Sequence, residues 1–325
     1  MASKRSHVIA VDIGGTKFIA AVVEDGGRIL SRVYCPTLAH EGPRKVIDRL
    51  ILSIRSAAHK SGIDIGDMQG IGVAAAGIID LNKGLIIESP NLPHWRNIKL
   101  IDILYKKFGG PIYLVNDASA AALGEFHLGA GHGVSNMVYL TVSTGIGGGI
   151  IINGDLYEGS DGCAGEFGHM IVDTDGPECK CGSRGCLEAL ASGTAIARMA
   201  RGRLENTDGS LLSEMNQGSA DNITSVMVAS AARRGDLLSN EVVKLAGRYL
   251  GIGLANIVNI FNPDMIVIGG GVSKMGELIL KPARKTMKEH AFKLPARRVS
   301  VVKSRLGENA GVIGASIYVT KRVGC

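Results

Sequence analysis

The stretch HVIAVDIGGTKFIAAVV, residues 7–23, joins two apolar runs through the glycine turn of DIGGTK, residues 12–17. The first run predicts a buried strand, and the second predicts a hairpin partner that ends at the DGG turn, residues 25–27. Glycines let backbone N–H groups point at an anion, and Thr or Lys adds a hydroxyl or a positive charge. We therefore expect a phosphate-binding hairpin, of neither the P-loop nor the dinucleotide-binding type.

The same arrangement begins again near the middle of the chain. NMVYLTVSTGIGGGIIING, residues 136–154, is another strand, glycine-rich turn and strand, and helices and strands alternate after each hairpin. We predict two α/β domains facing one another across a central cleft, with ligands at the carboxyl ends of the strands. One continuous doubly wound sheet is the alternative.

Three glycine clusters follow apolar strand-like runs. They are DIGGTK, STGIGGG at 143–149 and GGGVS at 269–273. A single cluster would be weak evidence, because glycine turns after strands are common. Three together indicate a nucleoside triphosphate site.

The bulk composition is that of a globular chain without a membrane segment. It has 325 residues and a formal net charge of +6, and no apolar run reaches the roughly 18 residues that cross a bilayer. The N-terminus passes straight into a strand-like run without a signal core, which predicts a cytoplasmic protein. Basic residues gather between Lys281 and Arg305, and Lys281, Arg284, Lys285 and Lys288 follow helical spacing. These four favour a solvated helix face over a polyanion-binding surface, because no aromatics lie between them for base stacking.

The segment GEFGHMIVDTDGPECKCGSRGCLEA, residues 165–189, gathers three of the six cysteines. His169, Cys179, Cys181 and Cys186 form a soft set of one imidazole and three thiolates, which predicts tetrahedral Zn²⁺. A disulfide is disfavoured, because cysteines two apart rarely reach bridge geometry and the expected compartment is reducing. Four protein ligands leave no open position, so the expected role of the metal is structural.

Taken together, VDIGGTKFIAAVV, VNDASAAALGE, STGIGGGIIING, GEFGHMIVD and CKCGSRGCLEALASG resemble the ROK family of repressors and sugar kinases. The resemblance covers essentially the whole chain and implies an actin/hexokinase-like (ribonuclease H-like) ATPase fold. It is greatest to the family's glucose kinases. It therefore implies ATP-dependent phosphorylation of a hexose, most of all glucose, at the 6-hydroxyl, with ATP and Mg²⁺ as co-substrate and Zn²⁺ as a structural ion.

The resemblance also assigns roles to residues that match the family's motifs. Asp117 would be the catalytic base, and Asp12 would lie near Mg²⁺, acting through water. Sugar contacts are implied for Gly77, Asn91, Asn116, Asp117, Glu166, His169 and Glu188. Nucleotide contacts are implied for Asp12, Gly14, Gly15, Thr16, Lys17, Thr144, Gly145, Gly147, Gly148, Gly270 and Gly271.

Simpler interpretations of these residues stay open. Asp117 alternatively only caps a helix, Asp12 only forms an Asx turn, and Glu166 and Glu188 are solvated surface carboxylates. The loop AAAGIID, residues 74–80, lacks the proline of the family's A-P-G loop, which puts fine sugar specificity in doubt.

The expected domains are residues 1–117, completed by a C-terminal helix at 310–325, and residues 118–309, which carry the zinc motif. The expected partners are a sugar and a nucleotide in a homodimer or homotetramer, with no nucleic acid and no membrane. Alternative substrates are N-acetylmannosamine, N-acetylglucosamine, fructose or allose, with polyphosphate a remoter donor. A sugar-responsive repressor is disfavoured, because few residues precede the first strand and a DNA-binding domain does not fit there.

Overall fold

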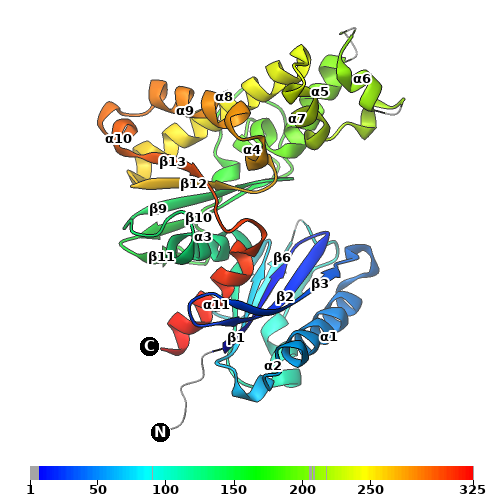
Figure 1. Ribbon diagram of the computed structural model, residues 1–325, viewed down its shortest axis with the longest axis vertical. Helices are drawn as coiled ribbons and strands as arrows, with labels where there is room; N and C mark the ends of the chain where they lie inside the picture. Colours follow the sequence, from blue (N-terminus) through cyan, green and yellow to red (C-terminus); the bar gives the residue numbers. More distant parts are fainter. Residues whose placement is uncertain (1–6, 90, 205–206, 208, 217, 325) are drawn as a thin grey trace. The chain divides into compact units, whose positions relative to one another are not determined.

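The protein is described by a computed structural model that covers residues 7–89, 91–204, 207, 209–216 and 218–324 (Figure 1). The chain forms two compact units. Unit 1 lies within residues 1–135, 149–165 and 305–325, and unit 2 lies within residues 136–148 and 166–304. The division differs from the expected domain boundary after residue 117, because helix α3 (Asp117–Leu128) packs with unit 1.

Unit 1 is built on a five-stranded sheet. Its central strand β1 (His7–Ile13) runs antiparallel to β2 (Lys17–Glu24) and parallel to β4 (Ile71–Ala75), and β4 runs parallel to β8 (Ile112–Asn116). The hairpin predicted from DIGGTK is therefore confirmed. The strand order is β3 (Ile29–Pro36), β2, β1, β4 and β8.

Alternate residues of β1 face opposite sides of this sheet. Ile9, Val11 and Ile13 belong to the core that includes residues of α1 (Pro43–Ser61) and α2 (Leu100–Phe108). The other side is covered by α11 (Ala310–Val323), which packs on β1, β4 and α3. Figure 1 shows α11, in red, alongside this sheet. Asp12, one position along from Val11, therefore lies on the side of the sheet that faces α11.

Helices α3 and α11 approach one another too closely for side chains at their contact. A Cβ on Gly314 of α11 would overlap the carbonyl oxygen of Ala120 in α3, and a Cβ on Gly124 would lie 2.6 Å from the carbonyl oxygen of Ala310. Because Asp117 begins α3, this contact fixes the position of the helix that carries it.

Replacing Gly314 with Ala is expected to lower the free energy of unfolding by about 1–3 kcal/mol, since backbone on both helices must move. Gly202 in α5 (Gly193–Leu204) is the matched control, because a Cβ there meets nothing within 4 Å. Gly202→Ala should leave stability unchanged or raise it by up to about 1 kcal/mol, through higher helix propensity. Urea unfolding of both variants measures the two effects, and equal stabilities would contradict the packing argument.

A small sheet follows β4 in unit 1. It comprises β5 (Ile78–Asp80), β6 (Leu85–Glu88) and β7 (Arg96–Ile98), paired antiparallel in that order. The sequence did not predict these three short strands. Asn91 lies between β6 and β7.

The second five-stranded sheet has the order β11 (Asp155–Tyr157), β10 (Ile146–Ile152), β9 (Met137–Val142), β12 (Met265–Gly269) and β13 (Ser300–Lys303). β12 runs parallel to both β9 and β13. Two separate five-stranded sheets rule out one continuous doubly wound sheet. The prediction of a two-domain α/β fold is confirmed.

The helices of unit 2 surround α8 (Leu237–Phe261), which packs on α4 (Leu187–Ala191), α5, α7 (Ser225–Arg233) and α9 (Glu277–His290). Thirteen residues of α8 are buried, so this long helix is the centre of the helical layer. No helix in the described part of the chain is long and apolar enough to cross a membrane. The remaining helices are α6 (Leu211–Met215) and α10 (Lys293–Arg298), with short 3-10 turns η1 (Ala39–Glu41), η2 (Ile65–Asp67), η3 (Phe167–His169), η4 (Ala220–Asn222), η5 (Val272–Met275) and η6 (Gly307–Asn309).

Candidate active site

The glycine turn between β1 and β2 is tight and lies against a distant loop. Gly14 N–H donates to the Lys17 carbonyl oxygen at 3.0 Å and closes the turn. A Cβ on Gly15 would lie 2.7 Å from the carbonyl oxygen of Asn91, so only glycine lets the two segments approach this closely. The structure thus brings Asn91, predicted to bind sugar, against the turn predicted to bind phosphate.

Lys17 is held in place by residues that the sequence analysis missed. Its Nζ lies 2.9 Å from Oε2 of Glu308 and 5.3 Å from the centre of the Tyr34 ring. Glu308 belongs to the short turn η6 that precedes α11. An anionic ligand at this turn would therefore compete with Glu308 for the Lys17 ammonium group.

Asp12 and Asp117 lie close together at the carboxyl ends of their strands. In the register of the sheet, Asp12 pairs with Ala74 of β4, which pairs with Val115 of β8, two residues before Asp117. Burial, and next the nearby Asp117 carboxylate, raise the pKa of Asp12 to about 7, whereas Lys17 acts in the opposite direction. A Cβ on Gly311, in the first turn of α11, would overlap Oδ2 of Asp12.

The raised pKa predicts a pH-dependent cost of keeping Asp12. The unfolded carboxyl loses its proton near 3.8 and the folded one near 7, so the folded state binds more protons between these values. Stability contributed by this group therefore falls as pH rises from about 4 to 7. We expect Asp12→Asn, in magnesium-free buffer, to match the unmodified protein near pH 3.5 and to exceed it at pH 8 by a few kcal/mol. Urea unfolding at both pH values tests this, and a variant less stable at pH 8 would contradict it.

The start of α3 separates the roles of Asn116 and Asp117. Asn116 is the N-cap, since its Oδ1 accepts the N–H groups of Ala118 at 2.9 Å and Ser119 at 3.2 Å. Asp117 is the first helical residue, and its Oδ1 accepts the Ala118 N–H at 2.9 Å. Because Asn116 already caps the helix, the alternative that Asp117 serves only as the cap loses its basis.

Gly77 occupies a position that requires glycine. Its φ is +118°, and a Cβ there would overlap the carbonyl oxygen of Glu88. Although the proline of the family's loop is absent, Gly77 holds the chain between β4 and β5 in close contact with the end of β6. The loop is thus fixed by close backbone packing.

In unit 2, two glycine turns lie side by side. The parallel pairing of β9 and β12 matches Thr141 with Gly269, and a Cβ on Gly270 would overlap the carbonyl oxygen of Val142. Gly271 follows at the start of η5, and Thr144 lies in the turn after β9. The carboxyl ends of both strands therefore carry the backbone predicted to contact nucleotide.

Gly147 and Gly148 differ from the expected position. Strand β10 begins at Ile146, so both glycines lie in the strand, and the turn itself contains only residues 143–145. At the next position of β10, close packing requires glycine, since a Cβ on Gly149 would lie 2.6 Å from the Ala122 Cβ in α3. The expectation that Gly147 and Gly148 belong to the turn was wrong.

Glu188 connects the glycine turn of unit 2 with the cysteine-rich segment. Its Oε2 accepts the N–H of Ile146 at 2.8 Å, and a Cβ on Gly145 would overlap the same oxygen. Glu188 is half-buried in α4, directly after Cys186 and Leu187. The alternative of a fully solvated Glu188 carboxylate is therefore wrong.

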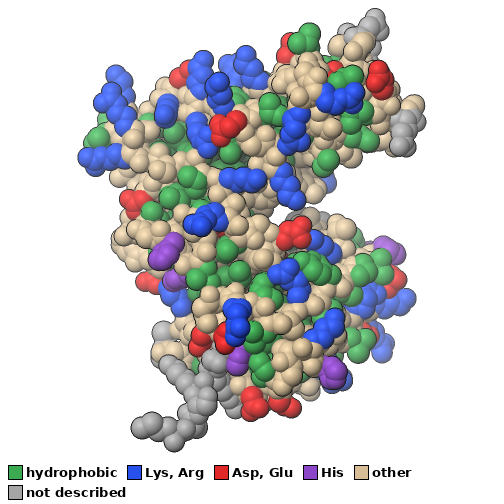
Figure 2. Space-filling model, in the orientation of Figure 1, with side chains coloured by type: hydrophobic (Ala, Val, Ile, Leu, Met, Phe, Trp, Pro, Cys, Tyr) green, Lys and Arg blue, Asp and Glu red, His purple; other side chains and the backbone are tan. Residues whose placement is uncertain are grey.

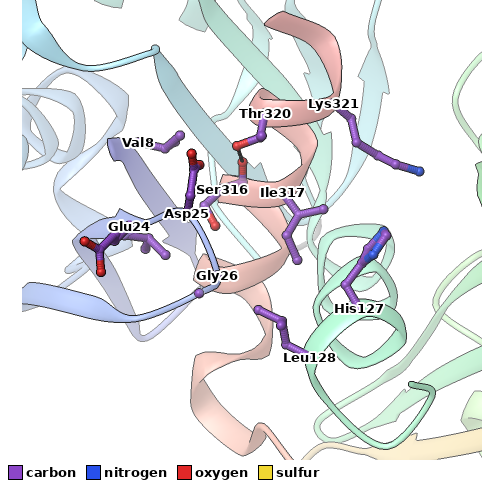
Figure 3. A pocket seen from close by; sticks show the side chains of 12 residues that line it. Val8, Glu24, Asp25, Gly26, His127, Leu128, Ser316, Ile317, Thr320 and Lys321 are labelled. Carbon is purple, nitrogen blue, oxygen red and sulfur yellow. Dashed lines mark hydrogen bonds between the residues drawn. The ribbon is translucent and has the colours of Figure 1, made fainter. Parts of the chain in front are cut away.

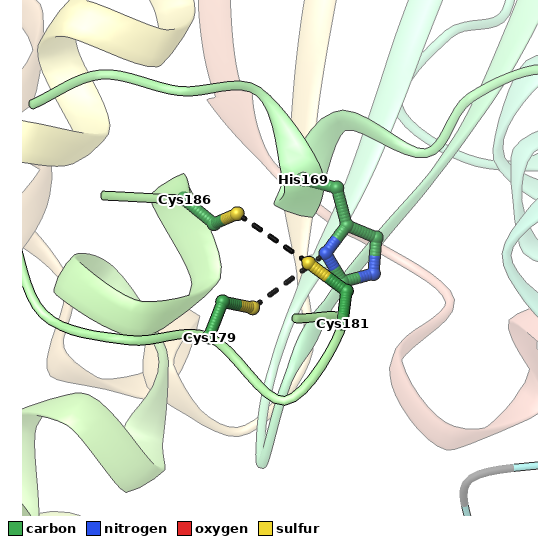
Figure 4. Close-up of side chains that lie close together, drawn as sticks. All are labelled: His169, Cys179, Cys181 and Cys186. Carbon is green, nitrogen blue, oxygen red and sulfur yellow. Dashed lines mark hydrogen bonds between the residues drawn. The ribbon is translucent and has the colours of Figure 1, made fainter. Parts of the chain in front are cut away.

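The four predicted zinc ligands lie together (Figure 4). One ligand atom from each of His169, Cys179, Cys181 and Cys186 lies within 4.8 Å of all the others. Zn–S bonds of about 2.3 Å in a tetrahedron place two sulfurs about 3.8 Å apart. The Cys181 and Cys186 sulfurs are 3.7 Å apart, and Nδ1 of His169 is 3.8 Å from the Cys179 sulfur. The donor set thus fits a tetrahedral zinc ion.

Backbone hydrogen bonds hold the cysteine-rich loop in this shape. Val172 N–H donates to the Gly185 carbonyl oxygen at 2.9 Å, and Cys179 N–H donates to the Ser183 carbonyl oxygen at 2.8 Å. Gly185 has a φ of +68°, and a Cβ there would overlap the Asp173 carbonyl oxygen. Gly185 therefore has to be glycine for the loop to bring Cys186 to the other ligands.

His169 turns its second ring nitrogen toward Glu166. Nε2 lies 3.9 Å from Oε2 of Glu166, while Nδ1 faces Cys179. About half of the Glu166 side-chain surface is exposed. The surrounding protein still removes enough water to raise the pKa of Glu166, His169 lowers it, and the nearby Glu188 raises it further. Glu166, His169 and Glu188 thus form one polar cluster.

A cavity of about 290 Å³ in unit 1 lies elsewhere (Figure 3). It lies between the turn after β2, the end of α3 and the last turns of α11, with His127 and Lys321 on one side. Val8, at the opposite end of β1 from Asp12, lines it. None of the predicted site residues lines this cavity.

Comparison with known proteins places these features in a family. The model of the ROK family matches residues 8–322. A glucokinase from Thermotoga maritima is 38% identical, over 98% of this chain and 98% of the relative. A ROK family glucokinase from Streptomyces griseus, solved in complex with glucose and AMPPNP, superimposes with a TM-score of 0.84 at 37% identity, over 97% of this chain and 99% of the other. A putative xylose repressor from Caldicellulosiruptor sp. is 33% identical over 96% of this chain, which spans 77% of the repressor.

Proposed function

Because the chain belongs to the ROK family, we propose that it is an ATP-dependent glucokinase, which converts ATP and D-glucose to ADP and glucose 6-phosphate. The observation that carries the proposal is the placement of Asp117. It begins a helix that Asn116 caps, beside Asp12 at the carboxyl ends of parallel strands. Phosphoryl transfer needs a carboxylate in such a position to orient and deprotonate the attacking hydroxyl.

In the proposed reaction, Asp117 accepts the proton of the glucose 6-hydroxyl. The oxygen forms a bond to the γ-phosphorus of ATP while the bond from that phosphorus to the bridging oxygen breaks, and ADP leaves with the electron pair. Asn116 uses its carbonyl oxygen as a helix cap, so its NH₂ group is the part that would donate to a sugar oxygen. Asn116 thus caps the helix, and the helix orients Asp117, whose carboxylate acts as the base.

We assign nucleotide binding to the glycine turns and their neighbours. Lys17 and the N–H groups of Gly15 and Thr16 would hold phosphate in unit 1, at the turn that Gly14 closes by donating to the Lys17 carbonyl oxygen. The turns at Thr144–Gly145 and Gly270–Gly271 would contact nucleotide in unit 2. The paired carboxylates of Asp12 and Asp117 fit a divalent cation, since a positive ion would offset the burial and the repulsion by Asp117 that together raise the pKa of Asp12. Mg²⁺, when bound with ATP, supplies charge neutralisation of the phosphates.

We assign sugar recognition to Gly77, Asn91 and Asn116 of unit 1 and to Glu166, His169 and Glu188 of unit 2. Carboxylates and amides on fixed backbone recognise sugar hydroxyls. Zn²⁺ would be held by Nδ1 of His169 and the three thiolates, which leaves Nε2 for a hydroxyl. When bound, zinc supplies a structural crosslink that orients the segments carrying Glu166 and Glu188. Thiolate ligands fit a reducing, cytoplasmic location, and we expect a homodimer or homotetramer.

A panel of sugars in a coupled ADP-release assay tests the function. We expect the highest kcat/KM with glucose among glucose, N-acetylmannosamine, N-acetylglucosamine, fructose and allose, with ATP preferred over polyphosphate. Another sugar exceeding glucose by tenfold or more would replace glucokinase with a different sugar kinase. Absence of turnover with every sugar and donor would overturn the kinase and favour a sugar-responsive regulator, as the repressor relative is named.

A further inference from the structure

The whole net charge of the protein resides in one short segment. Residues 277–303, from α9 through α10 to β13, contain eight Lys and Arg side chains and two Glu side chains, a surplus of six. The full chain has 36 basic and 30 acidic side chains, so the rest of the molecule is balanced. Figure 2 shows Lys and Arg side chains gathered over α9 and α10, at the upper left of the view. We call residues 277–303 the basic face.

Most cations of the basic face form no ion pair with an acidic side chain that the structure describes. Within the segment, Arg284 pairs with Glu277 at 2.8 Å and Lys285 with Glu289 at 3.8 Å. The other six make no ion pair with the residues that the structure describes. They all belong to exposed positions: Lys281, Lys288, Lys293, Arg297, Arg298 and Lys303.

An apolar tip projects from the middle of these cations. Phe292 is 75% exposed and Leu294 is 56% exposed, at the junction of α9 and α10, and Ile260 at the end of α8 is 68% exposed. The Phe292 N–H donates to Oδ1 of Asn259 at 2.8 Å, so the backbone of the tip is fixed by α8. A hollow of about 530 Å³ lies beside it, lined by Asn259, His290, Ala291, Phe292, Lys293 and Pro295.

This combination of charge and apolar side chains selects among partners. A two-fold interface with a second copy would bring the same six cations face to face, which is repulsive. Single-stranded nucleic acid binds through several stacked aromatic rings, and Phe292 is the sole Phe, Tyr or Trp of the segment. An anionic bilayer attracts clustered Lys and Arg through its surface potential and accepts Phe and Leu at the headgroup level.

We propose that the basic face docks reversibly on anionic phospholipid surfaces, with Phe292 and Leu294 entering the headgroup region. The sequence predicts a solvated helix face and no membrane partner. It does not indicate the apolar tip, because helical spacing does not reveal that Phe292 and Leu294 are exposed. The apolar side of α9 is buried against the protein, at Ile279, Leu280, Ala283 and Met287. Contact therefore uses the exposed cations and the tip, with no helix entering the bilayer.

Sedimentation with lipid vesicles tests the proposal. We expect the protein to bind vesicles of phosphatidylcholine mixed with phosphatidylglycerol about tenfold or more tightly than phosphatidylcholine alone, and to dissociate at high salt. Two variants should each weaken vesicle binding by about tenfold or more. One removes the apolar tip by combining Phe292→Ser with Leu294→Ser. The other removes three cations by combining Lys288→Gln, Lys293→Gln and Arg297→Gln. None of these residues has a role in the proposed kinase reaction, so kinase activity reports correct folding.

Matched controls separate the basic face from general charge and exposure. The apolar control combines Val226→Ser with Leu237→Ser, which changes two side chains of the same unit that are 76% and 80% exposed. The charge control removes three exposed cations of unit 1 by Lys60→Gln, Lys106→Gln and Lys107→Gln. Both should keep vesicle binding. As a direct probe, Phe292→Trp should show a blue-shifted emission on anionic vesicles, because the single natural Trp95 is buried.

Several results would overturn the proposal. These are no preference for anionic vesicles, equal loss in controls and test variants, or an unchanged emission of the Phe292→Trp protein. Retention on RNA without vesicle binding would instead assign the basic face to nucleic acid. A changed oligomeric state of the Phe292→Ser, Leu294→Ser protein with unchanged vesicle binding would assign the tip to a contact between copies. Vesicle binding without kinase activity would leave this proposal standing while the proposed function fails.

Discussion

Asp117→Asn is expected to lower kcat for glucose phosphorylation by about 10²–10⁴-fold, or roughly 3–5 kcal/mol of barrier, in steady-state assays. The change keeps the size of the side chain and an oxygen that can accept the Ala118 N–H, but it removes the proton acceptor. Glucose binding should change much less, since Asn116, Glu166, His169 and Glu188 are all retained. The loss should therefore appear in kcat and far less in the dissociation constant for glucose.

Asp236→Asn is the matched control for this variant. Asp236 is an N-cap, whose Oδ2 accepts the Ser239 N–H at 2.8 Å at the start of α8. Oδ1 of Asp236 also accepts the Leu211 N–H at 2.9 Å, and Asn would face one of these two donors with its own NH₂ group. This variant should therefore keep kcat while it loses part of its stability. If Asp117→Asn behaved like Asp236→Asn, with normal kcat, Asp117 would not be the base and the mechanism would need another proton acceptor.

The local parts of the site could be predicted from the sequence, because neighbouring residues define them. The DIGGTK turn needs only two apolar runs with glycines between them, and the hairpin formed where that pattern placed it. The predicted zinc ligands are also local, since a loop of 18 residues from His169 to Cys186 brings all four together. Donor chemistry and spacing were sufficient there.

Contacts between distant segments could not be predicted in the same way. Glu308 reaches Lys17 across 291 residues, and Gly15 packs on Asn91, because the fold returns α11 and the β6–β7 loop to the β1 turn. The glycines of STGIGGG look uniform in sequence, yet only residues 143–145 form the turn. A glycine needed for close packing within a strand and a glycine needed for a turn leave the same signal.

Removing one zinc ligand, by Cys181→Ala, is expected to abolish tight zinc binding, from about one ion per chain to almost none. Cys181 is exposed and contributes little packing, so the loss of stability should come from the metal. We expect the free energy of unfolding to fall by about 2–4 kcal/mol and Tm by roughly 5–10 °C. The KM for glucose should rise as well, because Glu166 lies three residues before His169 and Glu188 two residues after Cys186. Metal analysis, thermal unfolding and steady-state kinetics measure the three effects.

Cys163→Ala provides the control, since Cys163 is a half-buried thiol outside the ligand set. This variant should keep its zinc, its Tm and its KM. Glu188 is also tied to the glycine turn through the Ile146 N–H, whereas Glu166 is only near His169. Loss of zinc should therefore displace Glu166 more than Glu188. The substitution Glu166→Gln should then raise the KM for glucose by a smaller factor in the Cys181→Ala protein than in the unmodified protein. Full zinc content in Cys181→Ala, or none in unmodified protein purified without chelators, would show that these four residues do not form a zinc site.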